Sequence, residues 1–265
     1  MGGLGQALLN HQAPELAIIA VGVEQLAHSA IMLAKAGTRR ILIEKPGGLN
    51  VAELIELAKH NKSQNAQVWI AYNRRFYAST LQAEEMIAED GGVTSFHFEF
   101  TEWSHKIQHI QKAPGVMEHW VLGNSSHVLD LAFHLGGFPS DWRGWSEGGV
   151  KWHPESSRFC GAGVTEKGAM FSYFADWEAP GRWGLEMLTR KRRLIFRPME
   201  KLQVMPHGSV KIDSVELNDQ LDQDFKPGLY RQTLSFLTGD INLLCTIAEQ
   251  IKHAKLYSQI AGYLY

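Results

Sequence analysis

The sequence has little cysteine and no excess of positive charge. Cys160 and Cys245 are the only cysteines among 265 residues, so a disulfide framework and a cysteine-rich zinc site are both excluded. Lys and Arg number 26 against 28 Asp and Glu, whereas nucleic-acid binding needs a clear surplus of cationic side chains. We therefore expect a protein of the reducing cytoplasm without a nucleic-acid partner.

Long hydrophobic segments are also missing. The most continuous apolar run near the N-terminus covers residues 16–23, which is far shorter than the ~20 residues of a bilayer span. Residues 1–4 lack the basic and apolar regions of a secretory signal. The simplest expectation is a soluble cytoplasmic protein that has no membrane partner.

The start of a dinucleotide-binding fold is absent as well. Such folds open with a strand, a Gly-x-Gly-x-x-Gly turn and a helix whose N-terminus holds the pyrophosphate. Residues 3–8 match this pattern only superficially, because no strand fits into Met1 and Gly2. No acidic residue ends a second strand about 20 residues later. We therefore expect the usual phosphate site to be missing.

The first seventy residues alternate short apolar runs with helical segments. The apolar runs fall at residues 16–21, 41–44 and 68–72. Gly37 ends the first intervening helix, and Asn50 with Glu53 begins the second in the manner of a capping box. This alternation predicts a parallel α/β sheet.

From residue 93 onward the hydrophobic period changes to two. Phe96, Phe98 and Phe100 alternate with polar residues, which is typical of a sheet with one buried face. Further strands are predicted at residues 158–164, 169–177, 183–189 and 194–197, and helices at residues 78–88, at 125–135 and from 247 onward. Strands after a βαβ region favour a second, mainly antiparallel α+β domain. We expect domains at residues 1–72 and 73–265.

The most informative segment is residues 41–48, in which a buried strand ends in Glu44, Lys45 and Pro46. Ligands of open α/β sheets bind outside the carboxyl ends of the strands, so this lysine is placed for chemistry. An arbitrary lysine in a turn would more often be solvated. An ammonium desolvated in a cleft can have its pKa lowered toward neutrality and can then donate a proton.

A second candidate is His127, on the helix expected at residues 125–135. His127, Asp130 and His134 recur at helical spacing on one polar face. A structural hydrogen bond between His127 and Asp130 is one interpretation, and an acid/base role is another. Zinc binding by all three is a minor alternative, because such spacings arise readily by chance among 12 histidines.

Three segments together resemble the Gfo/Idh/MocA family of nicotinamide-dependent sugar oxidoreductases. They are residues 41–48, the Tyr-Asn-Arg-Arg-Phe of residues 72–76 and the Ser-His-Val-Leu-Asp of residues 126–130. The resemblance implies a Rossmann-like domain lacking its N-terminal part, followed by an open, mainly antiparallel sheet domain. The parallel strands would be strands 4, 5 and 6 of the 3-2-1-4-5-6 order, and residues 16–21 would form an exposed edge.

The resemblance also implies roles for individual residues. Lys45 and His127 would be catalytic. Cofactor contacts would come from Val21, Glu44, Lys45, Pro46 and Asn73, and substrate contacts from Arg75, Trp103, Asn124 and Asp130. The family's Asp-x-Gly-x-His-x-x-Asp segment has Gly123 at its first position here, which argues against a Lys-Asp-His trio. Asn124 offers only a neutral hydrogen bond.

By resemblance, the function is NAD- or NADP-linked oxidation or reduction of a sugar or sugar nucleotide. The alternative is a non-catalytic relative that binds a sugar-like ligand or a protein partner. Because the phosphate cradle is missing, we expect this chain to bind NAD or NADP weakly or not at all. Family members commonly pair through the open sheet, so a homo-oligomer is expected. The chain is either a truncated enzyme or covers its sheet edge in another way.

Overall fold

The computed structural model describes residues 3–263. Residues 1–2 and 264–265 lie outside the described residues. The prediction that Met1 and Gly2 form no strand concerns residues outside that range and stays a prediction. None of the described helices has the length and apolar character that crossing a membrane requires.

The chain divides into two compact units that are both discontinuous in sequence. The first comprises Met1–Tyr72, Lys112–Asn124 and Thr233–Ser258, and the second comprises Asn73–Gln111, Ser125–Gln232 and Gln259–Tyr265. The first change of unit falls between Tyr72 and Asn73. Two later segments nevertheless return to the first unit, so the simple division into residues 1–72 and 73–265 stays a prediction.

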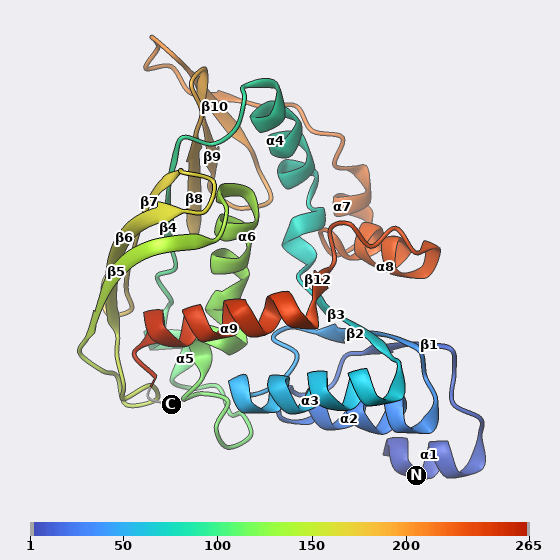
Figure 1. Cartoon of the computed structure of the whole chain (residues 1–265). Coiled ribbons are helices and arrows are strands. Elements are labelled where there is room, and N and C mark those ends of the chain that lie inside the picture. Colours follow the sequence, from blue (N-terminus) through green and yellow to red (C-terminus); the bar gives the residue numbers. More distant parts are fainter. Residues whose placement is uncertain (1–2, 264–265) are drawn as a thin grey trace. The chain divides into compact units, whose positions relative to one another are not determined.

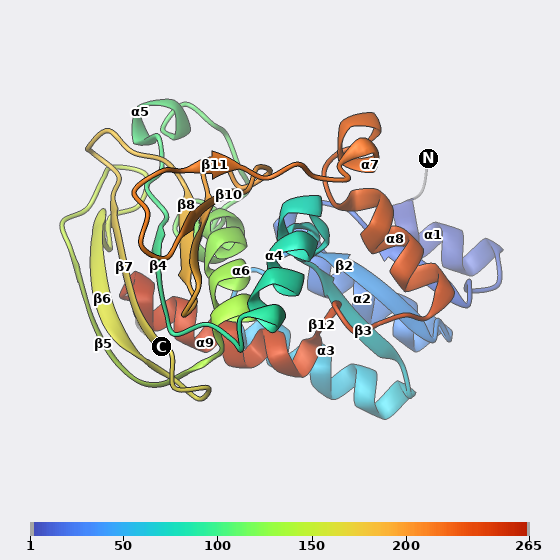
Figure 2. The same ribbon diagram turned by 90° about the horizontal axis from the view of Figure 1, so that it is seen from above.

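The first unit is a small α/β structure (Figures 1 and 2). Its elements are α1 (Gly3–Asn10), β1 (Leu16–Ile19), α2 (Val23–Ala36), β2 (Arg40–Glu44), α3 (Val51–Gln64), β3 (Gln67–Ala71), β12 (Cys245–Thr246), the end of α8 (Leu229–Thr238) and most of α9 (Ile247–Ala261). The sheet order is β1-β2-β3-β12. The first three strands are parallel and β12 is antiparallel to β3, which confirms the predicted parallel α/β sheet.

Local signals explain why these helices begin and end where they do. Gly37 ends α2 in the left-handed conformation with φ of 110°, which glycine adopts without steric cost. The Asn50 side chain accepts a hydrogen bond of 3.0 Å from the Glu53 amide, and the Glu53 carboxylate accepts one of 2.7 Å from the Leu49 amide. The predicted capping box is therefore confirmed, with its return bond one residue earlier than usual.

Strand β1 is the edge of the small sheet within the described residues. Ile18 keeps 51% of its surface exposed there, whereas Ile41, Leu42 and Ile43 of the neighbouring β2 are buried. This matches the apolar edge expected from the resemblance.

The second unit is built on an eight-stranded sheet. Its strands are β4 (Ser95–Glu99), β5 (Pro139–Glu147), β6 (Arg158–Thr165), β7 (Met170–Asp176), β8 (Gly184–Leu188), β9 (Arg192–Phe196), β10 (Gln203–Pro206) and β11 (Asp213–Ser214), and its helices include α4 (Ala78–Glu89), α5 (Ser104–Ile107), α6 (Ser126–Gly136) and α7 (Gln220–Asp224). The order is β11-β10-β9-β8-β4-β7-β6-β5. Only β4 and β7 pair in parallel among these strands. The expected mainly antiparallel second domain is confirmed as a fold class, although β5, β10 and β11 were not predicted.

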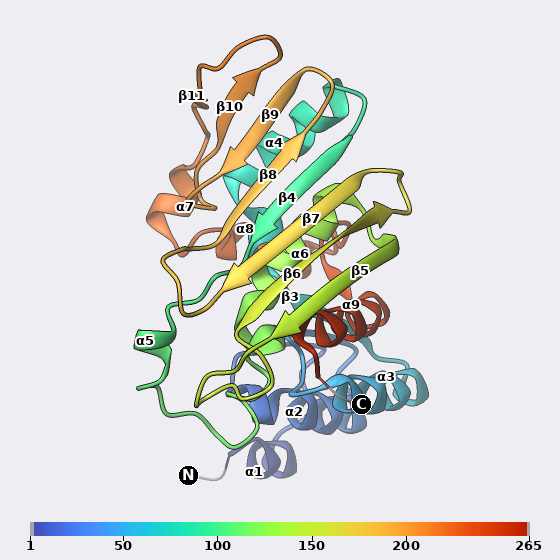
Figure 3. The same cartoon turned by 90° about the vertical axis from the view of Figure 1, so that its left-hand side faces the viewer.

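One face of the large sheet is covered by α6, which packs against β4 and β8. Phe133 of α6 meets Phe98 and Phe171 edge-on, each at 5.4 Å between ring centroids. Within the described residues, no helix of this unit lies over the opposite face, which is turned toward the viewer in Figure 3. Gly136 permits the close packing, because a Cβ atom there would lie 2.3 Å from the Phe96 ring.

We expect Gly136→Ala to destabilise the protein by about 1–3 kcal/mol, because the added methyl group overpacks the contact between α6 and β4. The matched control is Gly5→Ala in α1, where the new Cβ meets only the flexible Met32 side chain at 3.4 Å. That control should be neutral or stabilising by up to about 1 kcal/mol, since alanine favours helix more than glycine does. Urea unfolding measures both changes, and equal effects of the two substitutions would contradict the packing argument.

Candidate functional site

Lys45 follows β2 directly and is held in place by the first unit. Its backbone amide donates a hydrogen bond of 3.2 Å to the Glu44 carboxylate, and its Nζ donates one to the Gly123 carbonyl oxygen. The Lys45–Pro46 peptide bond is cis. Pro46 is buried, and its carbonyl oxygen accepts a hydrogen bond of 2.8 Å from the Gln250 side chain in α9. Two segments distant in sequence, at Gly123 and Gln250, therefore hold the Glu-Lys-Pro turn in place.

The partner of the Lys45 ammonium lies in a π-helical segment, Val121–Ser125, that leads into α6. Such segments are rare and frequently occur at functional sites. Gly123 stands where the family pattern has its first aspartate, so a backbone carbonyl contacts the lysine at that position. Asn124, a predicted substrate residue, is half-buried in the same segment.

His127 is half-buried in the first turn of α6, in the second unit. The helix is buried on most of its sides, with Val128, Leu129 and Phe133 all among its buried residues, which is typical of a helix inside a core. The His127 ring lies 6.2 Å from the Trp183 ring, measured between centroids. The side chain therefore borders an aromatic group just ahead of β8.

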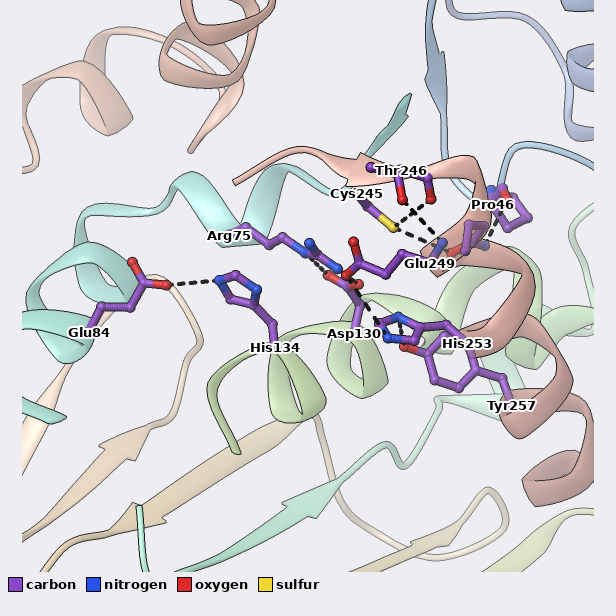
Figure 4. A network of polar contacts seen from close by, with 11 residues as sticks. Pro46, Arg75, Glu84, Asp130, His134, Cys245, Thr246, Glu249, His253 and Tyr257 are labelled. Atoms are coloured by element: carbon purple, nitrogen blue, oxygen red, sulfur yellow. Dashed lines mark hydrogen bonds and ion pairs between the residues drawn. The ribbon is translucent and has the colours of Figure 1, made fainter. Parts of the chain in front are cut away.

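The predicted polar stripe on α6 is wrong in one respect, because Asp130 is completely buried. Its carboxylate accepts two hydrogen bonds from Arg75, at 2.9 Å from Nε and 2.6 Å from Nη2 (Figure 4). Only 3% of the Arg75 side chain is exposed. His134 lies 2.8 Å from the Glu84 carboxylate instead, so Asp130 and His134 contact different residues.

Other predicted site residues also have structural contacts. The Asn73 side chain donates a hydrogen bond of 2.9 Å to the Pro227 carbonyl oxygen, and Val21 is half-exposed beyond β1. The cofactor roles of these residues and the substrate roles of Arg75 and Asp130 stay predictions.

A groove of about 790 Å³ opens in the second unit beside the predicted substrate residue Trp103. It is lined by residues 102–105, 108, 149–152 and 177–181. The Trp103 indole donates to the Gly181 carbonyl oxygen at 3.0 Å, and the Trp152 and Trp177 rings stack at 5.2 Å. Apolar aromatic walls with a few polar groups are typical of small-molecule sites.

Glu102 supplies a buried carboxylate to this groove. It accepts a hydrogen bond of 2.8 Å from the Ser125 hydroxyl and lies 3.8 Å from the exposed Arg182 guanidinium. Only 2% of the Glu102 surface is exposed, so its charge is largely removed from water and interacts strongly with nearby cations.

Sequence reasoning missed Trp183, whose ring borders His127, and Arg182, which contacts Trp183. Arg74 was considered for substrate contact together with Arg75 but was not chosen as a site residue. The guanidinium carbons of Arg74 and Arg182 lie 5.0 Å and 4.9 Å from the Trp183 ring centroid. Burial lowers the pKa of Arg74 from its ordinary value, an effect that nearby Arg182 reinforces and Glu200 opposes. No sequence signal separated Arg74 from Arg75, because the two arginines are adjacent and chemically identical.

No protein-family model matches this chain, and no curated protein matches it either. Solved structures are similar to it, among them UDP-N-acetylglucosamine 3-dehydrogenase from Acidithiobacillus ferrooxidans. That likeness has 15% identity and a TM-score of 0.75 and covers 100% of this chain and 82% of the other. Levoglucosan dehydrogenase in complex with NADH and levoglucosan has 18% identity, a TM-score of 0.73 and coverage of 97% and 80%.

An NAD-binding oxidoreductase from Klebsiella pneumoniae is similar as well, with 16% identity, a TM-score of 0.72 and coverage of 98% of this chain and 81% of the other. At such low identities the likeness shows the fold. The predicted fold class, a small parallel-rich sheet with a larger, mainly antiparallel one, is therefore confirmed.

We expect Arg75→Met to destabilise the protein by about 3–5 kcal/mol, because it leaves the buried Asp130 carboxylate without its bidentate partner. The control is Lys211→Met, which removes an exposed ion pair with Asp213 and should cost at most about 1 kcal/mol. The double substitution Arg75→Met with Asp130→Leu should recover part of the loss, since it removes the buried charge. Urea unfolding measures all three variants. Equal losses of stability for Arg75→Met and Lys211→Met would refute the role of the Arg75–Asp130 pair as a buried, stabilising ion pair.

Proposed function

We propose that this chain is an NAD(P)-dependent oxidoreductase of the Gfo/Idh/MocA type that acts on a sugar or sugar nucleotide, with Lys45 and His127 as its catalytic residues. The observation that carries the proposal is the position of Lys45 at the carboxyl end of a parallel strand, where open α/β sheets bind ligands. The similar structures add support, because one acts on UDP-N-acetylglucosamine and another holds NADH with levoglucosan.

The two side chains suit the proton step of such a reaction. NAD(P) supplies or accepts the hydride when a hydroxyl and a carbonyl interconvert, and the oxygen must then lose or gain a proton. An ammonium has three N–H donors, and the bond to Gly123 fixes the direction of Lys45. We propose that Lys45 holds the sugar oxygen and that His127 exchanges the proton, since an imidazole titrates near neutral pH.

The residues present fit the nicotinamide end of the cofactor better than its pyrophosphate. A pyrophosphate usually lies at a helix N-terminus that follows a parallel strand. At α2, the Glu24 carboxylate lies within 2.4 Å of where a Gly22 Cβ would stand, and at α3 the Glu53 carboxylate caps the amide of Leu49. Because carboxylates occupy both helix starts, we propose that this chain binds NAD or NADP weakly.

The alternative function is non-catalytic binding of a sugar-like ligand or a protein partner. The carboxylates at the two helix starts favour it, Glu24 in the first turn of α2 and Glu53 in that of α3, because they offset the positive potential that a dinucleotide would need there. The groove beside Trp103 supports ligand binding under either function. Sugar binding without hydride transfer would favour the alternative.

Titration calorimetry with NADH and NADPH should show dissociation constants well above the micromolar range for this 265-residue chain. Turnover of UDP-N-acetylglucosamine or levoglucosan is then followed by nicotinamide absorbance at the highest cofactor concentration that the assay allows. Lys45→Met should lower kcat/KM by about 10²–10⁴-fold, as expected for loss of an acid/base group, and the exposed Lys35→Met is the control. Micromolar cofactor binding would refute the weak-binding proposal, and equal activity of the two variants would refute the role of Lys45.

We also propose that the chain forms a homo-oligomer through the open face of the large sheet. Trp145 pairs with Cys160, and Cys160 with Phe174, so these side chains form a row across three strands. Trp145 is 62% exposed, Phe174 43% and Met170 of the same strand 65%. Large apolar side chains gathered on one surface are typical of protein interfaces.

Light scattering at micromolar concentration should give the mass of a dimer or a larger assembly for the unmodified chain. Phe174→Glu should reduce it to the monomer mass, because a carboxylate would be buried without a partner in the interface. Val210→Glu, at a side chain that is 93% exposed elsewhere, is the control and should leave the mass unchanged. A monomer mass for the unmodified chain would count against the proposal.

A further inference from the structure

Two arginines of the second unit contact one tryptophan beside His127. Arg74 lies in the 3-10 helix Asn73–Phe76, and Arg182 and Trp183 immediately precede β8. Both guanidinium carbons lie within about 5 Å of the Trp183 ring centroid, at 5.0 Å and 4.9 Å. Arg182 also lies 4.9 Å from the Trp103 ring centroid, so this cluster adjoins the groove beside Trp103.

Two buried N–H donors of the cluster have no acceptor. Among residues 3–263, neither the Nε of Arg74 nor the Nε1 of Trp183 has a hydrogen-bond partner, and both atoms are out of contact with solvent. Buried donors are nearly always paired in native proteins, since leaving one unpaired costs stability. Two such donors in contacting side chains therefore suggest that the partner is a ligand.

The charges of the cluster are also incompletely balanced. Arg182 lies 3.8 Å from Glu102, but within the described residues Arg74 forms no ion pair. Burial lowers the pKa of Arg74 most, and the nearby cation Arg182 adds to this effect, whereas Tyr77, Glu200 and Glu102 oppose it. An anion between the two arginines would offset both effects.

We infer that Arg74, Arg182 and Trp183 bind an anionic group of the substrate, either a phosphoryl group or a carboxylate. A guanidinium donates two parallel hydrogen bonds to either group, and the indole N–H adds a third donor. The rest of the ligand would lie in the adjoining groove, beside Trp103. The inference rests on the proposed function for the sugar part of the substrate, and it narrows the substrate class to acidic or phosphorylated sugars, sugar nucleotides included.

The purely structural alternative is a stack in which both cations only contact the indole face, as in ordinary cation–π pairs. Anion binding separates the two interpretations. We would titrate the whole chain calorimetrically with inorganic phosphate, D-glucuronate and D-glucose at low ionic strength, because salt screens exposed charges. Neither cofactor nor turnover enters this measurement, so failure of hydride transfer leaves its result standing.

At least one of the two anions should bind more tightly than D-glucose. If only phosphate binds, the anionic group of the substrate is a phosphoryl group, and if only glucuronate binds, it is a carboxylate. Binding of both supports a site that accepts either anion. Arg74→Gln and Arg182→Gln should each weaken anion binding by about tenfold or more, the usual effect of losing a charged hydrogen bond. Trp183→Phe keeps the aromatic contact and should weaken binding less.

The matched control is Arg190→Gln, which removes the same charge from the exposed turn between β8 and β9. Thermal unfolding shows whether each variant is folded, and the exposed Arg182 keeps the test available if Arg74→Gln is unstable. The inference is overturned if the unmodified chain binds neither anion, if Arg182→Gln leaves anion binding unchanged, or if Arg190→Gln weakens it as much as Arg182→Gln does.

Discussion

The buried ion pair between Arg75 and Asp130 positions most of the candidate site in the second unit. Arg75 belongs to the 3-10 helix that also carries Arg74, and Asp130 belongs to the helix that carries His127. Two hydrogen bonds of 2.9 Å and 2.6 Å therefore join the segment that carries the acid/base candidate His127 to the segment that carries Arg74, which we propose binds the anion. Since a bidentate pair restrains direction as well as distance, movement of either segment would displace both functional side chains.

Sequence alone predicted the features that depend on local signals. The strand before Lys45 and the caps at Gly37 and Asn50 need only a few neighbouring residues, and all were found. Asp130 was misplaced on a polar surface because its burial depends on a cation 55 residues away in the chain. Strand β5 was missed because most of its side chains are exposed, so its pairing with β6 leaves little hydrophobic pattern.

The two units differ in how they can interact with an anion. In the first unit, the N-termini of α2 and α3 carry the chain's own carboxylates, which offset the positive potential of those helix ends. In the second unit, two buried donors near Trp183 have no acceptor among the described residues. The proposed recognition of an anion therefore depends on guanidinium and indole groups more than on helix dipoles. This division could not be read from composition, since the overall charge is close to balance.

The parallel pairing of β4 with β7 has a consequence for biosynthesis. Strand β4 is flanked by β7 and β8, and its first residue, Ser95, pairs with Met170 and Leu188. A ribosome adds roughly 5–20 residues per second. Because β7 follows β4 by about 75 residues, β4 has no sheet partner for several seconds of synthesis. Meanwhile Phe96 and Phe98 lack the sheet that later buries them, and an apolar strand with unpaired edges is prone to aggregate. Among the described strands, β4 is thus the one whose first sheet partner lies furthest along the chain.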